Sequence, residues 1–149
     1  DAVWPRVAAA VPAARFRIAG RRPVAPVLAL AERPGIAVAA DVPDMAQEIG
    51  RCWVSIAPMQ SGVGIKNKVL EAWACARPVV LTPLATNGLT LPPGQGALVH
   101  AGGDAMADAV IRLFGDAATR LRLGQSAQAH VRTHFTWASA ARRIEALLR

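Results

Sequence analysis

The chain has 149 residues, 53% of them hydrophobic, which suits one domain with a buried core and excludes an intrinsically disordered protein. The formal net charge is +7, yet the basic residues are scattered along the chain, so we do not expect nucleic acid as the partner. This charge better suits a phosphorylated ligand or an anionic membrane surface, and no apolar run approaches the roughly 20 residues that would cross a bilayer.

Along the chain, short apolar runs alternate with longer segments of helical periodicity. Strands are predicted over the apolar runs at residues 14–20, 35–39, 52–57, 77–82 and 96–100. Helices are predicted at residues 1–11, 26–33, from 44, at 67–76, 104–114 and 116–134, and from 136. The predicted helix N-caps are Asp44, with Gln47 in capping-box spacing, and Asp104, Asp116 and Thr136.

This alternation predicts an α/β domain with a doubly wound, mainly parallel sheet that helices flank on both faces. Such a domain normally opens with a strand, whereas this chain opens with a helix. We therefore expect that the first strand, a central one, is missing and that the chain is part of a longer protein. Ligands of such sheets bind beyond the carboxyl ends of the strands. The Pro- and Gly-rich segment at residues 86–96 is expected to form a mobile flap at this edge.

The third predicted strand leads into a loop and a helix start that together carry three anion-binding features. Gly62 and Gly64 allow backbone N–H groups to approach a ligand closely. The helix that begins after Ile65 offers unpaired N–H donors and a partial positive charge. Lys66 and Lys68, the only lysines of the chain, add two full charges. This segment is expected to hold a phosphate or diphosphate group.

Glu71 lies one turn into the same helix. A carboxylate would repel phosphates, so we expect it to accept hydrogen bonds from another group, and the vicinal hydroxyls of a ribose are a natural donor pair. An anion cradle followed by a diol acceptor predicts a nucleoside diphosphate. The structural alternative is a basic loop followed by a helix with Glu near its start, which the helix dipole favours by itself.

The segment at residues 58–80 resembles the donor-binding motif of the group 1 GT-B glycosyltransferases (family 4), in the form Gly-x-Gly-Ile-Lys-x-Lys-Val-Leu-Glu-Ala, and the similarity extends from about Pro12 to Arg149. The resemblance implies that residues 1–149 are the Rossmann-like C-terminal half of such an enzyme, which binds a UDP- or GDP-sugar donor. An absent N-terminal domain would bind a glycan or a lipid-linked acceptor, and the fragment alone would be inactive. The resemblance further implies retaining hexosyl transfer in bacterial polysaccharide synthesis, without metal or cofactor.

Site residues follow from the resemblance position by position. Glu71 matches the glutamate that binds the donor ribose, and the backbone around Ala40–Val42 matches the region that flanks the nucleobase. Gly20, at a strand end that the similarity includes, is a further candidate for donor binding. The loop that contacts the diphosphate and the sugar consists of Gly62, Val63, Gly64, Ile65 and Lys66. Lys66 is the catalytic candidate, because its charge would stabilise the departing diphosphate. Many family members carry a second glutamate where this chain has Val63, so the identity of the donor sugar stays open.

Other functions and residues are weighed against this interpretation. There are two alternatives. One is a UDP-sugar epimerase of the same fold, and the other is a non-catalytic basic module that binds nucleic acid or membrane. His130 and His134 have a spacing that can bind metal, but we expect a solvated helix face. Arg21 and Arg22 follow a strand end, where ligand binding and plain solvation are equal alternatives, and Asp41 is expected in a turn.

The two cysteines, Cys52 and Cys75, lie in apolar surroundings without CxxC spacing. They predict buried, reduced thiols. We therefore expect a cytoplasmic protein, with a peripheral position on the inner face of the bacterial plasma membrane if the positive charge binds anionic lipids.

Overall fold

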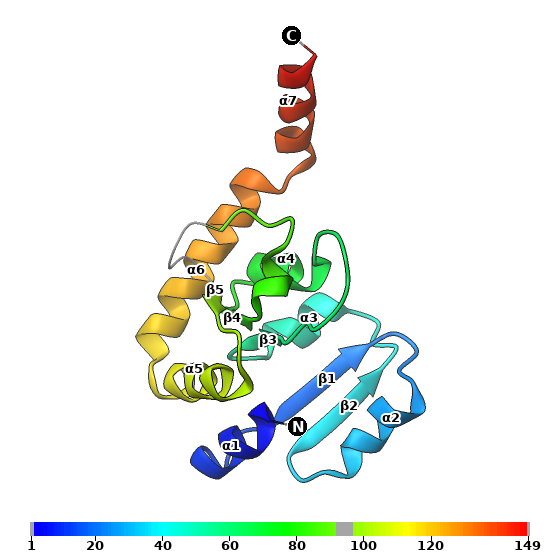
Figure 1. Cartoon of the computed structure of the whole chain (residues 1–149), viewed down its shortest axis with the longest axis vertical. Coiled ribbons are helices and arrows are strands. Elements are labelled where there is room, and N and C mark those ends of the chain that lie inside the picture. Colours follow the sequence, from blue (N-terminus) through cyan, green and yellow to red (C-terminus); the bar gives the residue numbers. More distant parts are fainter. Residues whose placement is uncertain (1, 92–96, 149) are drawn as a thin grey trace.

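The computed structural model describes residues 2–91 and 97–148 and has the predicted α/β architecture, with parallel strands flanked by helices (Figure 1). The strands form two sheets. β1 (Phe16–Gly20) pairs with β2 (Ile36–Ala40), while β3 (Ser55–Ala57), β4 (Val79–Leu81) and β5 (Ala97–Val99) form a second sheet in the order β3-β4-β5. All three pairings are parallel. The sheet expected from the sequence is therefore divided between β1 and β3.

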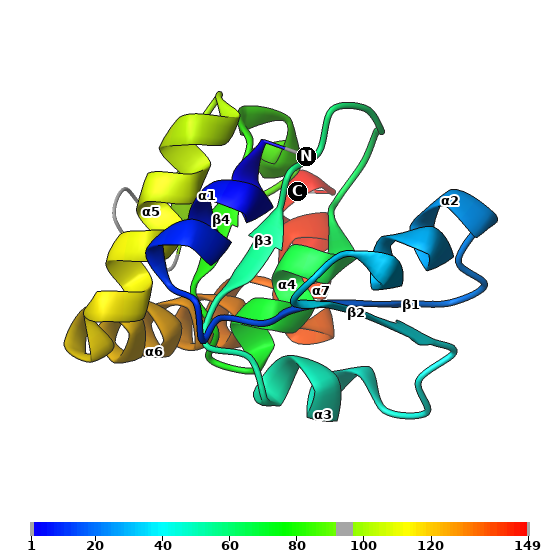
Figure 2. The ribbon, with the colours of Figure 1, turned by 90° about the horizontal axis from the view of Figure 1, so that it is seen from below.

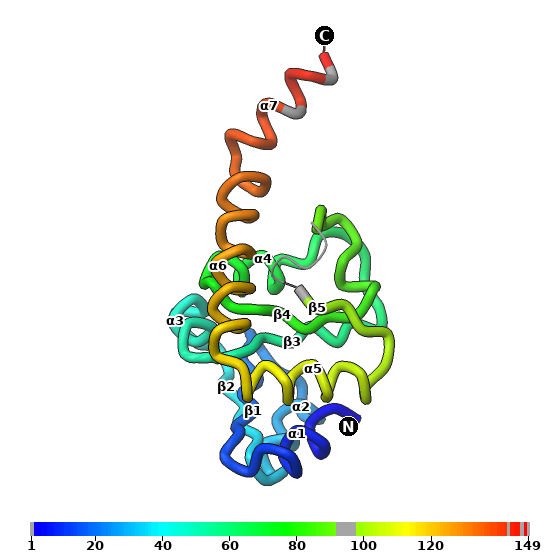
Figure 3. The backbone as a smooth tube through the Cα atoms, turned by 90° about the vertical axis from the view of Figure 1, so that its left-hand side faces the viewer, coloured from blue at the N-terminus to red at the C-terminus, as the bar shows by residue number. Residues whose placement is uncertain are grey.

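Helices connect these strands and cover them. They are α1 (Val3–Ala10), α2 (Ala25–Leu28), the 3-10 turn η1 (Ala29–Glu32), α3 (Met45–Gly50), α4 (Asn67–Ala74), the 3-10 turn η2 (Pro83–Thr86), α5 (Gly103–Gly115), α6 (Ala117–His134) and α7 (Trp137–Leu147). Helix α1 packs beside α5, and α4 contacts both α3 and α6 (Figure 2). Helix α7 extends away from the rest of the molecule in two perpendicular views (Figures 1 and 3).

The hydrophobic core is centred on β4, whose three residues are at most 1% exposed. Successive side chains of a strand point to opposite faces. Accordingly, Val80 joins a buried cluster with side chains of α1 and α5, whereas Val79 and Leu81 join a second cluster with side chains of α4. Helices therefore cover both faces of the β3-β4-β5 sheet, as the doubly wound prediction requires.

Some element boundaries differ from the sequence prediction. The third strand begins at Ser55 instead of residue 52, because the Cys52 N–H donates to the Ile49 carbonyl and so closes the turn after α3. The helix predicted over residues 26–33 is divided into α2 and η1. Residues 92–96 of the predicted flap lie outside the described residues.

Three of the four predicted helix caps are confirmed. The side chains of Asp44, Asp116 and Thr136 each accept a hydrogen bond from a backbone N–H in the first turn of their helices. Asp104 is not a cap, because α5 begins one residue earlier with Gly102 as its N-cap, and the Gly102 carbonyl accepts from the Met106 N–H at 3.1 Å. The Asp104 carboxylate instead forms an ion pair with Arg6 of α1, at 2.8 Å.

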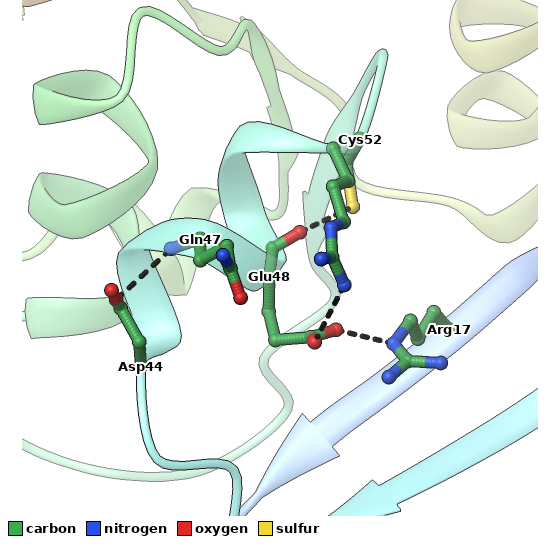
Figure 4. A network of polar contacts seen from close by, with 6 residues as sticks. Arg17, Asp44, Gln47, Glu48 and Cys52 are labelled. Carbon is green, nitrogen blue, oxygen red and sulfur yellow. Dashed lines mark hydrogen bonds and ion pairs between the residues drawn. The ribbon is translucent and has the colours of Figure 1, made fainter.

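A buried carboxylate ties the β1-β2 sheet to the helix that follows it (Figure 4). Glu48 of α3 is 9% exposed and pairs with the guanidinium of Arg17 on β1 and, at 3.4 Å, with that of Arg51. The Cys52 thiol donates to the backbone carbonyl of Glu48 at 3.5 Å. Since a buried charge requires compensation, these contacts fix α3 against β1 and so position the loop between β2 and α3.

Candidate functional site

A cavity of about 450 Å³ opens at the carboxyl ends of β1 and β2, the edge where the sequence predicts a ligand. Its walls come from three parts of the chain: the end of β1, the loop from β2 to the start of α3, and the second turn of α4. The lining residues are Gly20, Arg21, Asp41, Val42, Pro43, Met45 and Glu71. Three predicted site residues that are distant in sequence, Gly20, Val42 and Glu71, therefore meet around one cavity.

The β1 and β2 sides of this cavity are joined by two hydrogen bonds of Asp41. Its N–H donates to the Gly20 carbonyl at 2.8 Å, and its carboxylate accepts from the N–H of Arg22 at 3.0 Å. Both Asp41 and Arg22 have left-handed backbone conformations, with φ of 50° and 47°. Such conformations are uncommon for residues other than glycine and gather at functional sites, so the observed pair points to a role for this edge.

Glu71 reaches the cavity from a helix that is firmly held. Val69, Ala72 and Trp73 of α4 are 0% exposed and form part of the core beneath the helix. Glu71 lies on the opposite, exposed face. The carboxylate is therefore presented to solvent at a defined position, and it is available to accept hydrogen bonds from a ligand in the cavity.

The glycine-containing loop before α4 has the conformation that its glycines permit. Gly62 and Gly64 have φ of 114° and 73°, in the region that favours glycine. Between them Val63 is 97% exposed. Lys66 is only 5% exposed, and its ammonium group donates to the Gly64 carbonyl at 2.9 Å within the same loop. Neither Lys66 nor the loop residues line the cavity around Glu71.

The N-terminus of α4 lacks a side-chain cap, although the Val69 N–H donates to the Lys66 carbonyl at 2.8 Å. Its N-cap residue, Lys66, makes no side-chain capping bond. The N–H groups of the first helical turn therefore have no side-chain acceptor from the cap. Lys68 lies in this turn and points across the loop, where its ammonium group contacts the Met59 sulfur at 3.3 Å.

Three lining residues, Arg21, Pro43 and Met45, were not among the predicted site residues, and Asp41 was included only through the backbone of residues 40–42. Arg21 follows the end of β1 directly and Asp41 follows the end of β2, so position at the carboxyl edge was the available signal. The sequence predicts a turn at Asp41 but not its left-handed backbone conformation. That turn decides which side chains border the cavity.

The histidine pair on α6 was expected to be solvated, and for His130 this is wrong. His130 is 8% exposed, its Nε2 bonds to the Thr90 carbonyl, and its ring meets the edge of Trp73 at 6.1 Å between centroids. The reason is that this face of α6 packs on α4. Within residues 2–91 and 97–148, no group of three or more His, Cys, Asp or Glu side chains is arranged to hold a metal ion.

Two further expectations concern the thiols and the membrane. Cys52 and Cys75 are free and half-buried, and burial raises the pKa of both thiols above the ordinary value. Over the part of the chain that the structure describes, none of the helices has the length and apolar character that a bilayer span needs.

Comparison with known proteins places this geometry in context. Residues 1–116 match the family model described as glycosyl transferases group 1. The fold is similar to that of Anabaena Alr3699/HepE, solved in complex with UDP and glucose, with a TM-score of 0.78 at 14% sequence identity. That match covers 99% of this chain and 43% of the HepE chain. A search of curated proteins found no significant match.

Proposed function

The chain belongs to the group 1 glycosyl transferases, and from this premise we propose that it is the C-terminal, donor-binding half of a family 4 GT-B enzyme. It binds a nucleoside-diphosphate sugar whose hexosyl group is transferred, with retention, to a glycan or a lipid-linked acceptor in bacterial polysaccharide synthesis. The fragment alone is inactive, because the acceptor is bound by a further, N-terminal domain.

One observation carries this proposal: Glu71 lines a cavity together with Gly20 and Val42 at the carboxyl edge. Glu71 accepts the ribose hydroxyls there. The start of α4 at Asn67 lies four residues earlier, about 6 Å along a helix at 1.5 Å per residue, which suits the reach from a ribose diol to the phosphates on its 5′ carbon. The diphosphate is held at the helix N-terminus and the glycine loop.

Lys66 is proposed as the residue that stabilises the departing diphosphate. Its ammonium group is nearly buried and has a neutral carbonyl as its hydrogen-bond partner, so its charge is not neutralised within the loop. A buried cation of this kind gains strongly from an anion. Because Lys66 faces Gly64 and not the cavity, the loop must shift when the diphosphate binds, and the left-handed glycines on either side of Val63 permit such a shift.

The similarity to HepE supports a nucleotide-sugar ligand, since that structure contains UDP and glucose. This chain spans 43% of the length of HepE, which leaves room for an acceptor domain in a longer protein. We further propose that metal is not required. The enzyme acts in the cytoplasm at the inner face of the plasma membrane, where the net charge of +7 favours anionic lipids.

The open edge of β1 supports the proposal of a missing first strand. The Phe16 N–H donates to Gly35, and the Gly20 carbonyl accepts from Asp41, so these residues of β1 face β2. By alternation, the backbone groups of Arg17 and Ala19 face the other edge, which no described strand pairs. The doubly wound order 3-2-1-4-5-6 has its first strand at this place.

Calorimetric titration with UDP and GDP tests the proposed function. The wild-type chain should bind at least one of them with micromolar to millimolar affinity, and Glu71→Ala should weaken that binding by at least about tenfold, because the ribose loses its acceptor. Glu145→Ala, on exposed α7, is the matched control and should bind as the wild type does. Undiminished binding by Glu71→Ala would contradict the proposal. Salt-sensitive binding to DNA without a nucleotide response would identify a basic module instead.

A further inference from the structure

The cavity contains a donor and an acceptor of hydrogen bonds that the ribose and the phosphates do not use. Arg21 and Asp41 both line it, one after each strand end, and both side chains are exposed. A guanidinium group only donates hydrogen bonds, and an ionised carboxylate only accepts them. The two groups therefore offer opposite hydrogen-bonding characters around one cavity.

The order of groups along a nucleotide assigns the side of the cavity at the two strand ends to the base. If the α4 N-terminus holds the diphosphate and Glu71 holds the ribose, the part of the cavity beyond Glu71 receives the base. Val42, Pro43 and Met45 line the same cavity and supply apolar surface for a flat ring. Besides Glu71, Arg21 and Asp41 are the charged residues that line the cavity, so they are placed to meet the polar edge of the ring.

Asp41 is held in place more firmly than an exposed aspartate usually is. One carboxylate oxygen accepts from the Arg22 N–H, and the backbone N–H of Asp41 donates to Gly20. The other carboxylate oxygen has no hydrogen-bond partner among the described residues. A fixed acceptor with a free oxygen, beside a long and adjustable donor, is an arrangement that can read a hydrogen-bonding pattern.

We propose that Arg21 and Asp41 recognise the imide edge of uracil, so that the nucleotide of the donor is a uridine diphosphate. This inference rests on the proposed function. Uracil presents a central N–H with a carbonyl oxygen on each side, so Asp41 accepts from the N–H while Arg21 donates to a carbonyl on either side. Cytosine presents a bare ring nitrogen beside an amino group. An aspartate at the centre then faces a lone pair, and an arginine on the amino side faces a second donor.

UDP and CDP form a matched pair for the test, because they differ only at this edge of the ring. The wild-type chain should bind UDP about tenfold more tightly than CDP, the scale of a well-placed bidentate discrimination. Arg21→Met should bring the ratio of the two affinities below about threefold, mainly through weaker UDP binding. Asp41→Asn keeps an oxygen for Arg22 and tolerates the left-handed backbone. Because its amide can donate to the cytosine ring nitrogen, it should narrow the same ratio through tighter CDP binding.

Arg122→Met is the control for charge, since it removes one positive charge from an exposed position of α6 and should leave the ratio unchanged. Thermal unfolding of each variant verifies that it is folded. Equal losses of UDP and CDP affinity in Arg21→Met would make Arg21 a phosphate contact and overturn the inference. Equal binding of UDP and CDP by the wild type would also overturn it while leaving the proposed function intact. A chain that binds neither these nucleotides nor GDP would refute the proposed function itself.

Discussion

The two sheets of this molecule differ sharply in how far their residues are removed from solvent. In the β1-β2 sheet no residue is buried, and Phe16, Ile18 and Val38 remain partly exposed. In the other sheet, every residue of β4 is buried, and both hydrophobic clusters of the core surround this strand. A two-stranded sheet without its own core is marginally stable, so the β3-β4-β5 sheet and its helices hold the fold together.

The cavity lies where these two regions meet, and each contributes a different kind of wall. Glu71 comes from a helix anchored in the core, whereas Gly20, Arg21, Asp41 and Val42 come from the ends of the exposed sheet. The contact with the ribose is thus expected to be rigid. The selectivity for the base resides in residues whose replacement costs little stability, which is where specificity can change without loss of the fold.

The largest expected effect tests whether stability is concentrated around β4. Trp73→Ala should lower the free energy of unfolding by about 3–5 kcal/mol, because the indole is 0% exposed and its removal leaves a cavity. Val38→Ala, in β2, should cost about 1 kcal/mol or less, since its side chain already meets solvent. Urea denaturation measures both. Similar losses in the two variants would contradict the contrast between the sheets.

A second effect concerns glycines in the two regions. A Cβ atom at Gly124 of α6 would lie 2.1 Å from the Ala76 carbonyl oxygen, so Gly124→Ala should destabilise the protein by about 1–3 kcal/mol. A Cβ atom at Gly20 would have no neighbour within 4 Å, so Gly20→Ala should be neutral or slightly stabilising. Thermal unfolding of the two variants gives the comparison. A loss at Gly20 as large as that at Gly124 would show that β1 is packed as tightly as α6.

The smallest expected effect is the pH dependence of a helix cap in the more stable region. The Asp116 carboxylate accepts from the Thr119 N–H at the start of α6, and this hydrogen bond holds its pKa below the ordinary value. A lowered folded-state pKa means that the cap contributes fully above the unfolded pKa and that the contribution is lost as pH falls through the folded pKa. The melting-temperature advantage of wild type over Asp116→Ala should therefore be constant near neutrality and shrink below about pH 4. An advantage independent of pH would contradict this role of the charge.

Local signals in the sequence predicted much of the fold. Asp44, Asp116 and Thr136 could be assigned as caps because capping depends on the side chain and the next few residues. The N-cap of α5 at Gly102 instead depends on a backbone conformation that a glycine does not indicate in the sequence. His130 was missed because its burial results from packing of α6 on α4, a contact between distant segments.

The candidate site, like the fold, could be predicted only where the signal is local in the sequence. The loop and Glu71 carry a spacing that can be recognised locally, and Gly20 and Val42 follow from the resemblance. Arg21 and Asp41 could be placed at the carboxyl edge, but not around one cavity, because that depends on two left-handed residues and a hydrogen bond between segments about twenty residues apart.

The central claim is that the cavity between the strand ends and Glu71 receives a nucleoside, and an NMR titration of the ¹⁵N-labelled chain with UDP tests it directly. We expect the backbone amide signals of Gly20, Arg21, Val42 and Glu71 to shift together, with one dissociation constant. A second cavity, of about 410 Å³ and lined in part by Trp4 and Gly35, lies away from these residues and serves as the internal reference. Shifts confined to that second cavity, with the four signals unmoved at saturating UDP, would contradict the account.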